Sequence, residues 1–262
     1  MTPKLAVIQF PGSNCEYETA YACSLAGFET SIVRWNEEVK FLDLFDAYVL
    51  PGGFSYQDRV RSGEIAAKLP IMSVLAKAAD EGKPILGICN GCQILAAARL
   101  IPHLALAPNR KENEAVGFIC DWVFVKIQNP EKSVFTRYFS QTEVLPIPIN
   151  HGEGRFILSP EAASEWPNLA AIRYCSEKGA IDPYFPHNPN GSEYNLAGLC
   201  NARGNVLAIM PHPERASLLK QMPTWIDSDW AETKKNKLAT SEPTHPGPWH
   251  PLFLSAYKGC LE

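Results

Sequence analysis

The sequence predicts an α/β fold: a mostly parallel central sheet, helices on both of its faces, and a strand-rich second half. Short apolar runs alternate with helical segments through the first half of the chain, which is typical of a doubly wound parallel sheet. The second half carries several apolar runs with fewer helical segments between them. The 262 residues, 46% of them hydrophobic, are enough for one large α/β domain or two small ones.

The first half divides into strands and helices at its turn residues. We expect strands at 5–10, 30–34, 45–50 and 84–88, and helices at 16–26, 63–81 and 93–100. Gly27 ends the first helix, and Pro51-Gly52-Gly53 stops the third strand. Because parallel sheets bind ligands beyond the carboxyl ends of their strands, the loops after these strands are where we expect a site.

In the second half we expect strands at 117–127, 144–149, 169–175, 196–201 and 206–210. The composition changes after Pro211. Residues 223–262 contain three Trp, a Lys-rich cluster and a stretch rich in Pro and His. We therefore predict a domain over 1–222 and a C-terminal extension over 223–262, which is either a partner-docking arm or a solvated extension.

Charge and hydropathy narrow the class of protein. The net charge is −4 and the acidic and basic residues are mixed, so the sequence does not predict a nucleic-acid partner. No apolar run approaches the roughly 20 residues that a membrane span needs. The N-terminus reads as a first strand rather than a signal peptide, which predicts a cytoplasmic protein. In such a chain the eight cysteines are expected to be free thiols, and one of them is a candidate nucleophile.

The segment around Cys89 has the pattern of a nucleophile elbow. An apolar strand runs into Cys89, a helix follows, and Gly87 and Gly91 lie two residues to either side. The helix N-terminus favours a thiolate and points free N–H groups at any oxyanion formed there. Three alternatives remain: a buried structural cysteine, a redox pair with Cys92 in a C-x-x-C motif, and a zinc site, which lacks a second C-x-x-C pair.

A candidate base and its partner lie at the end of the last expected strand. His212 and Glu214 are two residues apart, with Pro213 between them holding the segment toward extended geometry. In an extended segment residues i and i+2 face the same way, so the carboxylate can orient the imidazole. The remaining isolated histidines, His103, His187, His245 and His250, are expected to be structural.

Pro51-Gly52-Gly53 follows another apolar strand and is a candidate oxyanion loop, because glycines let backbone N–H groups approach a ligand closely. The combination of this loop with Gly87-Ile-Cys89-Asn-Gly91-Cys-Gln93 and His212-Pro-Glu214 resembles the triad-type (class I) glutamine amidotransferases, which have a flavodoxin-like fold.

Within that family the sequence is similar to the PurQ type, the glutaminase subunit of phosphoribosylformylglycinamidine synthase. The similarity covers roughly residues 4 to 220. It is carried by Gln9-Phe-Pro-Gly-Ser-Asn-Cys15, Phe54-Ser-Tyr, Asn150-His-Gly-Glu-Gly-Arg-Phe156, Asn190-Gly-Ser192 and Gly204-Asn-Val-Leu-Ala-Ile-Met-Pro-His-Pro-Glu-Arg215.

The resemblance implies a mechanism for L-glutamine hydrolysis. Cys89 would attack the carboxamide, and the backbone N–H groups of Gly53 and Asn90 would hold the oxyanion. His212, oriented by Glu214, would protonate the departing ammonia and then activate water against the thioester. Gln93 would help to bind the glutamine.

The resemblance also implies partners. Ammonia would pass to a large synthetase subunit of the PurL type, assembled with a small bridging subunit of the PurS type. That synthetase would use ATP and Mg²⁺ to amidate formylglycinamide ribonucleotide in purine biosynthesis, so this chain would need no cofactor and no metal of its own. His151, Glu153 and Arg155 are candidates for the interface with the synthetase.

Two positions depart from the family pattern. Gln57 stands where the family usually has Gly, and Cys92 stands where a bulky apolar residue is usual; we interpret Cys92 as a small core residue. Two other functions stay open from the residues alone. One is a stand-alone cysteine hydrolase or peptidase, and the other is a redox module that uses Cys89 and Cys92 and does not need His212.

Overall fold

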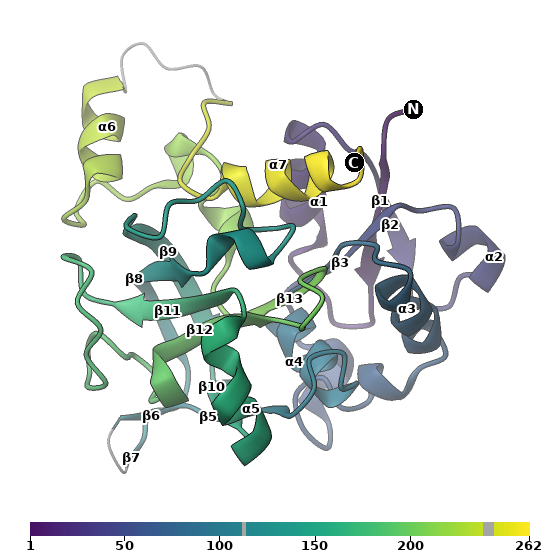
Figure 1. The fold of residues 1–262 in the computed structure, drawn as a ribbon, viewed down its shortest axis with the longest axis horizontal. Helices are drawn as coiled ribbons and strands as arrows, with labels where there is room; N and C mark the ends of the chain where they lie inside the picture. Colours follow the sequence, from purple (N-terminus) through teal and green to yellow (C-terminus); the bar gives the residue numbers. More distant parts are fainter. Residues whose placement is uncertain (112–113, 238–243) are drawn as a thin grey trace.

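The structure is a computed structural model that describes residues 1–111, 114–237 and 244–262. One large sheet contains nine strands: β1 (Lys4–Gln9), β2 (Glu29–Arg34), β3 (Ala47–Leu50), β4 (Ile85–Ile88), β8 (Ile119–Gln128), β9 (Leu145–His151), β11 (Ala171–Cys175), β12 (Leu196–Cys200) and β13 (Val206–Ile209). Their order is β2-β1-β3-β4-β13-β12-β11-β8-β9 (Figure 1). Two short pairs lie outside it: β5 (Leu104–Pro108) with β10 (Glu153–Leu158), and β6 (Arg110–Lys111) with β7 (Glu114–Ala115).

The sheet is parallel in one half and antiparallel in the other. Strands β2, β1, β3, β4 and β13 run parallel, and β12, β11, β8 and β9 continue the sheet through antiparallel pairs. Strands β3, β4 and β13 are buried along their whole length, as expected for parallel strands with both faces covered. The α/β prediction is confirmed, with the parallel order confined to these five strands.

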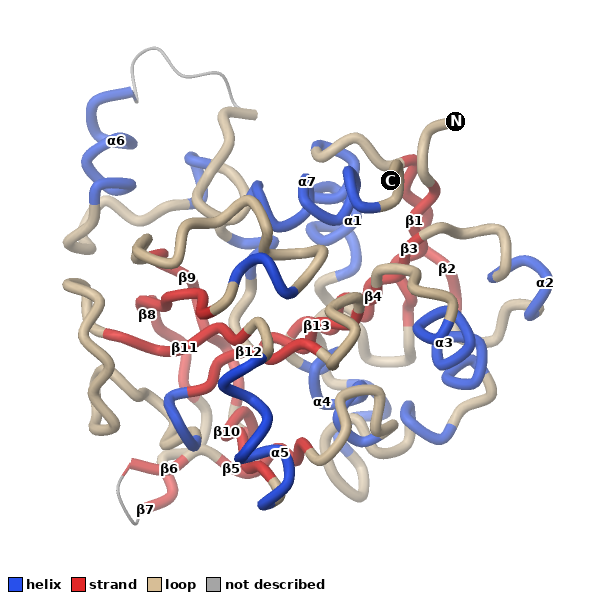
Figure 2. Tube along the Cα trace, in the orientation of Figure 1, coloured by secondary structure: helices blue, strands red, loops and turns tan. Residues whose placement is uncertain are grey.

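Seven α-helices occur in the described residues: α1 (Glu16–Leu25), α2 (Val39–Leu42), α3 (Ile71–Asp80), α4 (Asn90–Ala97), α5 (Pro160–Glu165), α6 (Asp229–Lys237) and α7 (His250–Gly259). Short 3₁₀ turns are η1 (Ser55–Asp58), η2 (Ala66–Lys68), η3 (Pro130–Lys132), η4 (Trp166–Asn168), η5 (Glu193–Asn195), η6 (Pro213–Arg215) and η7 (Leu219–Gln221). Helices α1 and α7 lie together on one side of the sheet and α4 on the other (Figures 1 and 2). No described helix has the length and hydropathy that crossing a membrane requires.

The single helix expected over residues 63–81 is wrong. The chain instead forms η2, breaks, and starts α3 at Ile71. Pro70 is the physical reason, because proline disfavours helical geometry in the residue before it. Leu69 accordingly adopts extended angles, with φ −76° and ψ 151°.

The end of the chain packs into the same hydrophobic core as the sheet. Trp249 is fully buried, and its indole Nε1 donates to the Pro146 carbonyl at 3.0 Å. In α7, Leu252 and Phe253 are buried, and the Tyr257 ring packs edge-on against Phe28 of the β2 side. The boundary predicted at residue 222 therefore does not coincide with a gap in the packing. Helix α6 is different: only its Ala231 is buried.

Candidate active site

Cys89 lies at the sharp turn between β4 and α4, with φ 50° and ψ −104°. A positive φ is costly for a cysteine, and such strain is concentrated at functional sites. The flanking glycines are required by close packing. A Cβ on Gly91 would lie 1.9 Å from the Leu50 carbonyl oxygen, and one on Gly87 would lie 2.5 Å from the Leu95 side chain. The predicted elbow is thus present, and glycine is what lets α4 approach β3 and β4.

His212 and Glu214 form a buried pair beyond the end of β13. The imidazole Nδ1 lies 2.6 Å from Glu214 Oε1, and the two residues are 2% and 1% exposed. The segment is less extended than expected, because Pro213 begins the turn η6. The pair forms all the same, and the His212 N–H is anchored on the Pro148 carbonyl at 2.9 Å.

The pKa of His212 reflects two opposing effects. Burial alone would lower it, but the Glu214 carboxylate, together with the neighbouring thiols of Cys89 and Cys15, raises the pKa well above its ordinary value. The imidazole is therefore held in its charged form, which is able to donate a proton.

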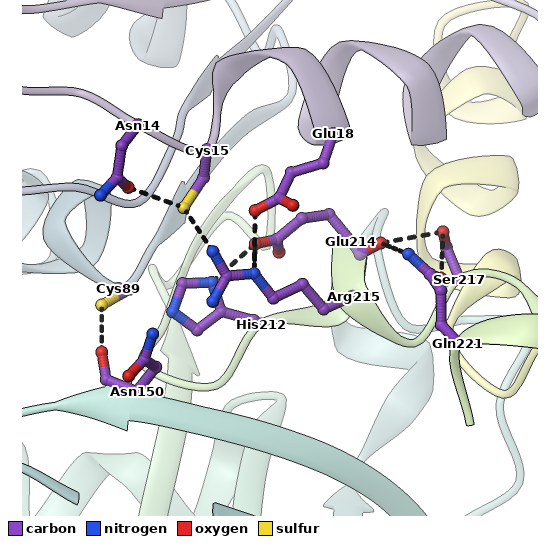
Figure 3. A network of polar contacts seen from close by, with 10 residues as sticks. All are labelled: Asn14, Cys15, Glu18, Cys89, Asn150, His212, Glu214, Arg215, Ser217 and Gln221. Carbon is purple, nitrogen blue, oxygen red and sulfur yellow. Dashed lines mark hydrogen bonds and ion pairs between the residues drawn. The ribbon is translucent and has the colours of Figure 1, made fainter. Parts of the chain in front are cut away.

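Cys89 and His212 lie near one another (Figure 3), and the Gly52 backbone is close to both. A Cβ on Gly52 would lie 2.8 Å from His212 Cε1 and 3.5 Å from Cys89 Cβ, so only a glycine fits there. The Cys89 thiol lies 3.6 Å from the Asn150 carbonyl oxygen. The structure thus brings Cys89, at the turn between β4 and α4, close to His212 and Glu214, at η6. The sequence predicted these three residues as one group.

A cavity of about 300 Å³ opens in front of these residues. It is lined by Asn14, Cys15, Gly53, Phe54, Asp58, Ser62, Cys89, Gln93, Pro108, Phe118, Asn150, His151, Gly152, Glu153, His212 and Arg215. A larger cavity of about 810 Å³ lies beside it and shares Ser62 and Gln93 with it, but none of the triad residues. The smaller one is therefore the candidate substrate pocket.

Two backbone N–H groups are available beside Cys89. Asn90 is the first residue of α4, where an N–H has no partner within the helix. The Gly53 N–H has no acceptor among the described residues, and Gly53 lines the cavity. Both were predicted as oxyanion donors, and their positions are compatible with that role.

The Gln93 side chain is engaged by the protein. Its Oε1 accepts from Asn90 Nδ2 at 2.8 Å, and its Nε2 donates to the Glu153 carbonyl at 2.6 Å. Asn90 Oδ1 in turn accepts from the Ser55 N–H. Gln93 lines the cavity, so its contact with glutamine stays a prediction, but it also connects α4 to the start of β10.

His151 is buried beside the cavity, and the interface role expected for it stays a prediction. It is 2% exposed and lines the cavity. Buried Asn109 fixes its tautomer: Asn109 Nδ2 donates to the carbonyls of Gly117 and His151, which leaves Oδ1 to accept from Gly154 N–H and His151 Nδ1. Burial, followed by the charge of His212, lowers the pKa of His151 to about 3, which keeps the imidazole neutral.

Glu153 and Arg155 are only partly buried, so their interface role stays a prediction. Glu153 lines the cavity and lies 3.5 Å from Arg61. The Arg155 Nε donates to the Pro108 carbonyl at 3.2 Å.

The redox alternative has no geometric support. Cys92 is fully buried among apolar residues, and burial, then the charge of Cys89, raises its pKa well above the ordinary value. It is a core residue, as interpreted from the sequence.

Cys15, His212 and Glu214 each offer a ligand atom within 4.8 Å of the others, which is close enough to hold a metal ion. Two observations disfavour a cation site. His212 and Glu214 are hydrogen-bonded to each other, as in a triad, and the positive guanidinium of Arg215 lies beside Cys15.

Sequence reasoning did not assign Cys15 and Arg215 to the site. The Arg215 Nη2 donates to the Cys15 thiol at 3.2 Å, and both residues line the cavity. Their only sequence signal was membership of two motifs, Gln9-Phe-Pro-Gly-Ser-Asn-Cys15 and the segment ending at Arg215, which lie far apart in the chain.

Comparison with known proteins places this site in a family. Residues 2–259 match the model of the CobB/CobQ-like glutamine amidotransferase domain. The phosphoribosylformylglycinamidine synthase subunit PurQ of Methanothrix thermoacetophila is 46% identical over 84% of this chain and 89% of its own. The protein of the same name from Methanocaldococcus jannaschii is 44% identical over 82% and 90%.

A solved structure gives the same answer. A chain in the structure of PurLQS from Thermotoga maritima is 32% identical and has a TM-score of 0.74, with 100% of both chains covered. The chain therefore belongs to the CobB/CobQ-like glutamine amidotransferase family and, within it, to the PurQ subunits of phosphoribosylformylglycinamidine synthase.

Proposed function

We propose that this chain hydrolyses L-glutamine to glutamate and ammonia through a thioester on Cys89. The observation that carries the proposal is the buried His212–Glu214 pair, joined at 2.6 Å, facing a cysteine at a strained strand-to-helix turn. A cysteine, an imidazole and an orienting carboxylate are the components that nucleophilic acyl transfer requires.

Each residue has one role in the reaction. Cys89 adds to the carboxamide carbon of glutamine as a thiolate, its proton being held by charged His212, and the carboxamide oxygen takes up the electron pair as an oxyanion. The N–H groups of Gly53 and Asn90 donate to that oxyanion.

When the tetrahedral species collapses, the C–N bond breaks and charged His212 gives its proton to the leaving nitrogen, which departs as ammonia. Neutral His212 then takes a proton from water as the water attacks the thioester. The C–S bond then breaks, glutamate leaves, and the Cys89 thiolate is restored beside charged His212. Glu214 keeps the imidazole in one tautomer throughout.

The ammonia is consumed by a partner. The relatives carry the name of a subunit of phosphoribosylformylglycinamidine synthase, and the solved relative is a PurLQS structure. The proposed partners are a large PurL-type synthetase subunit and a small PurS-type bridging subunit. In the complex the synthetase would use ATP and Mg²⁺ to convert formylglycinamide ribonucleotide to formylglycinamidine ribonucleotide, and this chain would supply the nitrogen.

Mass spectrometry after treatment with an electrophilic glutamine analogue tests the proposal, with and without the synthetase. We expect a single adduct on Cys89 that is absent in Cys89→Ser and slowed in His212→Ala. Cys92→Ala is the matched control and should label like the wild type. Labelling that requires the synthetase would show activation by docking. No adduct in either sample, or equal modification of Cys92, would contradict the triad.

A further inference from the structure

Residues 11–15, here called the Cys15 loop, pack along the candidate oxyanion loop. The Phe54 N–H donates to the Gly12 carbonyl at 2.8 Å, and the N–H groups of Asn14 and Cys15 both donate to the Gly52 carbonyl at 3.3 Å. The contact leaves no space for a side chain, because a Cβ on Gly53 would lie 2.7 Å from the Gly12 oxygen and from Ser13 Cα.

These contacts determine where the Gly53 N–H points. A trans peptide is planar, and its C=O and N–H point in opposite directions. Since the Gly52 carbonyl is held toward the Cys15 loop, the N–H of the same peptide, on Gly53, points away from that loop. Gly53 lines the cavity that contains Cys89, and its N–H has no acceptor among the described residues, so it is free to donate to a ligand there.

Arg215 fastens the Cys15 loop to the triad segment (Figure 3). Its Nη2 donates to the Cys15 thiol at 3.2 Å, and its Nε donates to Glu18 of α1 at 2.8 Å. Arg215 follows Glu214 in η6, and its Nε lies 3.9 Å from Glu214 Oε1. One planar guanidinium thus contacts the Cys15 loop, α1 and the triad carboxylate, a geometry that lysine cannot reproduce.

We propose that Arg215 and Cys15 are positioning residues that set the Gly53 oxyanion donor in register with His212 and Glu214. The inference rests on the proposed function and deepens it. Both residues line the cavity, but neither has a role in making or breaking the C–N and C–S bonds. They act through the Gly52–Gly53 peptide, whose carbonyl accepts from the N–H groups of Asn14 and Cys15.

An aldehyde analogue of glutamine separates this role from a general loss of the site. The aldehyde adds to the Cys89 thiol, and the oxygen of the adduct occupies the oxyanion position. In Arg215→Lys we expect the affinity for the aldehyde and the kcat of glutamine hydrolysis to fall together by about tenfold. The KM for glutamine should change less than twofold, because an oxyanion donor acts in the transition state. Alkylation of Cys89 by iodoacetamide, which does not use the oxyanion position, should keep the wild-type rate.

A second pair of variants keeps the test independent of Arg215. Cys15→Ala removes the acceptor and should reproduce the same effects, whereas Cys15→Ser retains an acceptor and should recover at least half of the wild-type kcat. Arg203→Lys is the matched control, because Arg203 donates to the Asp80 carbonyl at the opposite ends of the strands; it should behave as wild type.

Three outcomes would overturn the inference. If Arg215→Lys lowered both the affinity for the aldehyde and the rate of Cys89 alkylation by iodoacetamide, Arg215 would act on the thiol or on His212. A lower melting temperature with unchanged kinetics would mean a purely structural role. Equal kcat in Cys15→Ala and the wild type would remove Cys15 from the arrangement. If the aldehyde fails to bind the wild-type enzyme at Cys89, the proposed function itself fails.

Discussion

Glu214 determines the charge of His212. The carboxylate is 1% exposed and lies 2.6 Å from the imidazole, in surroundings where burial would otherwise leave the imidazole neutral. The structure therefore assigns the supply of a proton to the pair and not to His212 alone.

Replacing the carboxylate by its isosteric amide tests this assignment. In Glu214→Gln we expect kcat to fall by roughly 10³-fold with KM little changed, because burial then lowers the pKa of His212 and the imidazole lacks both its proton and its orientation. Steady-state glutaminase kinetics measure both parameters. A kcat within threefold of wild type would show that Glu214 is dispensable.

Gln57 occupies backbone space that favours glycine. Its φ is 60°, within a left-handed stretch that also includes Tyr56 and Asp58. This explains the departure noted in the sequence: a side chain stands at a position where glycine would be free of steric strain.

Gln57→Gly should raise the free energy of unfolding by about 0.5–1 kcal/mol, since relief of the left-handed strain exceeds the entropy that glycine loses on folding. Urea denaturation at constant m-value measures the gain. Gln57→Ala is the matched control, because it removes the same side chain but keeps Cβ, and it should show no gain. If Gln57→Gly and Gln57→Ala stabilised the protein equally, the gain would come from loss of the Gln57 side chain and not from relief of backbone strain.

At the scale of elements, the C-terminal part of the chain contains two unlike helices. Helix α7 packs against α1 and η6, and Trp249, just before it, is fully buried and donates to the Pro146 carbonyl. The segment before α6 carries Trp225, which is 70% exposed. The residues grouped as one extension therefore include a core helix as well as an exposed one.

The two tryptophans give a matched comparison. Trp249→Ala should lower the free energy of unfolding by about 3–5 kcal/mol, because it leaves a large cavity and an unpaired Pro146 carbonyl. Trp225→Ala should change it by less than about 0.5 kcal/mol in the isolated chain. Similar values for the two would mean that α7 does not pack as described. Loss of synthetase binding in Trp225→Ala alone would support the docking-arm interpretation.

Across the whole molecule, two buried histidines give stability opposite dependences on pH. His151 has a folded pKa of about 3, below its unfolded value, so acid favours the unfolded chain. His212 has a raised folded pKa, so the stability that it contributes is complete below pH 6.5 and is lost as the pH rises through its folded pKa. Their windows lie on opposite sides of pH 6.5, so the stability that these two groups contribute together is greatest near that pH.

The acid side is testable with one variant. Between pH 5 and 6, one proton taken up only by the unfolded chain makes the free energy of unfolding rise by up to about 1.4 kcal/mol per pH unit. In His151→Gln the slope of the free energy of unfolding against pH should be smaller by about 1.4 kcal/mol per pH unit. The carboxylates contribute equally to the slope in both proteins, so their contribution cancels in the comparison. Denaturation at several pH values measures it. An unchanged slope would mean that folded His151 accepts a proton as readily as the unfolded chain does.

The sequence alone determined those parts of the site that are formed by residues close together in the chain. Gly87 and Gly91 around Cys89 predicted the elbow, and His212 with Glu214 predicted the buried pair, because each arrangement depends on residues within a few positions of one another. The alternation of strands and helices likewise predicted the parallel half of the sheet, since strand–helix–strand units pack locally.

Only the tertiary structure decided the features that join distant segments. Cys15 and Arg215 are 200 residues apart and touch because β1 and β13 end at the same edge of one sheet. His151 was predicted only as an interface candidate, yet it is buried, and Asn109, between β5 and β6, hydrogen-bonds its imidazole. Local patterns specify backbone turns and short-range pairs, whereas burial and long-range hydrogen bonds depend on which strands become neighbours, and that is settled only when the sheet assembles.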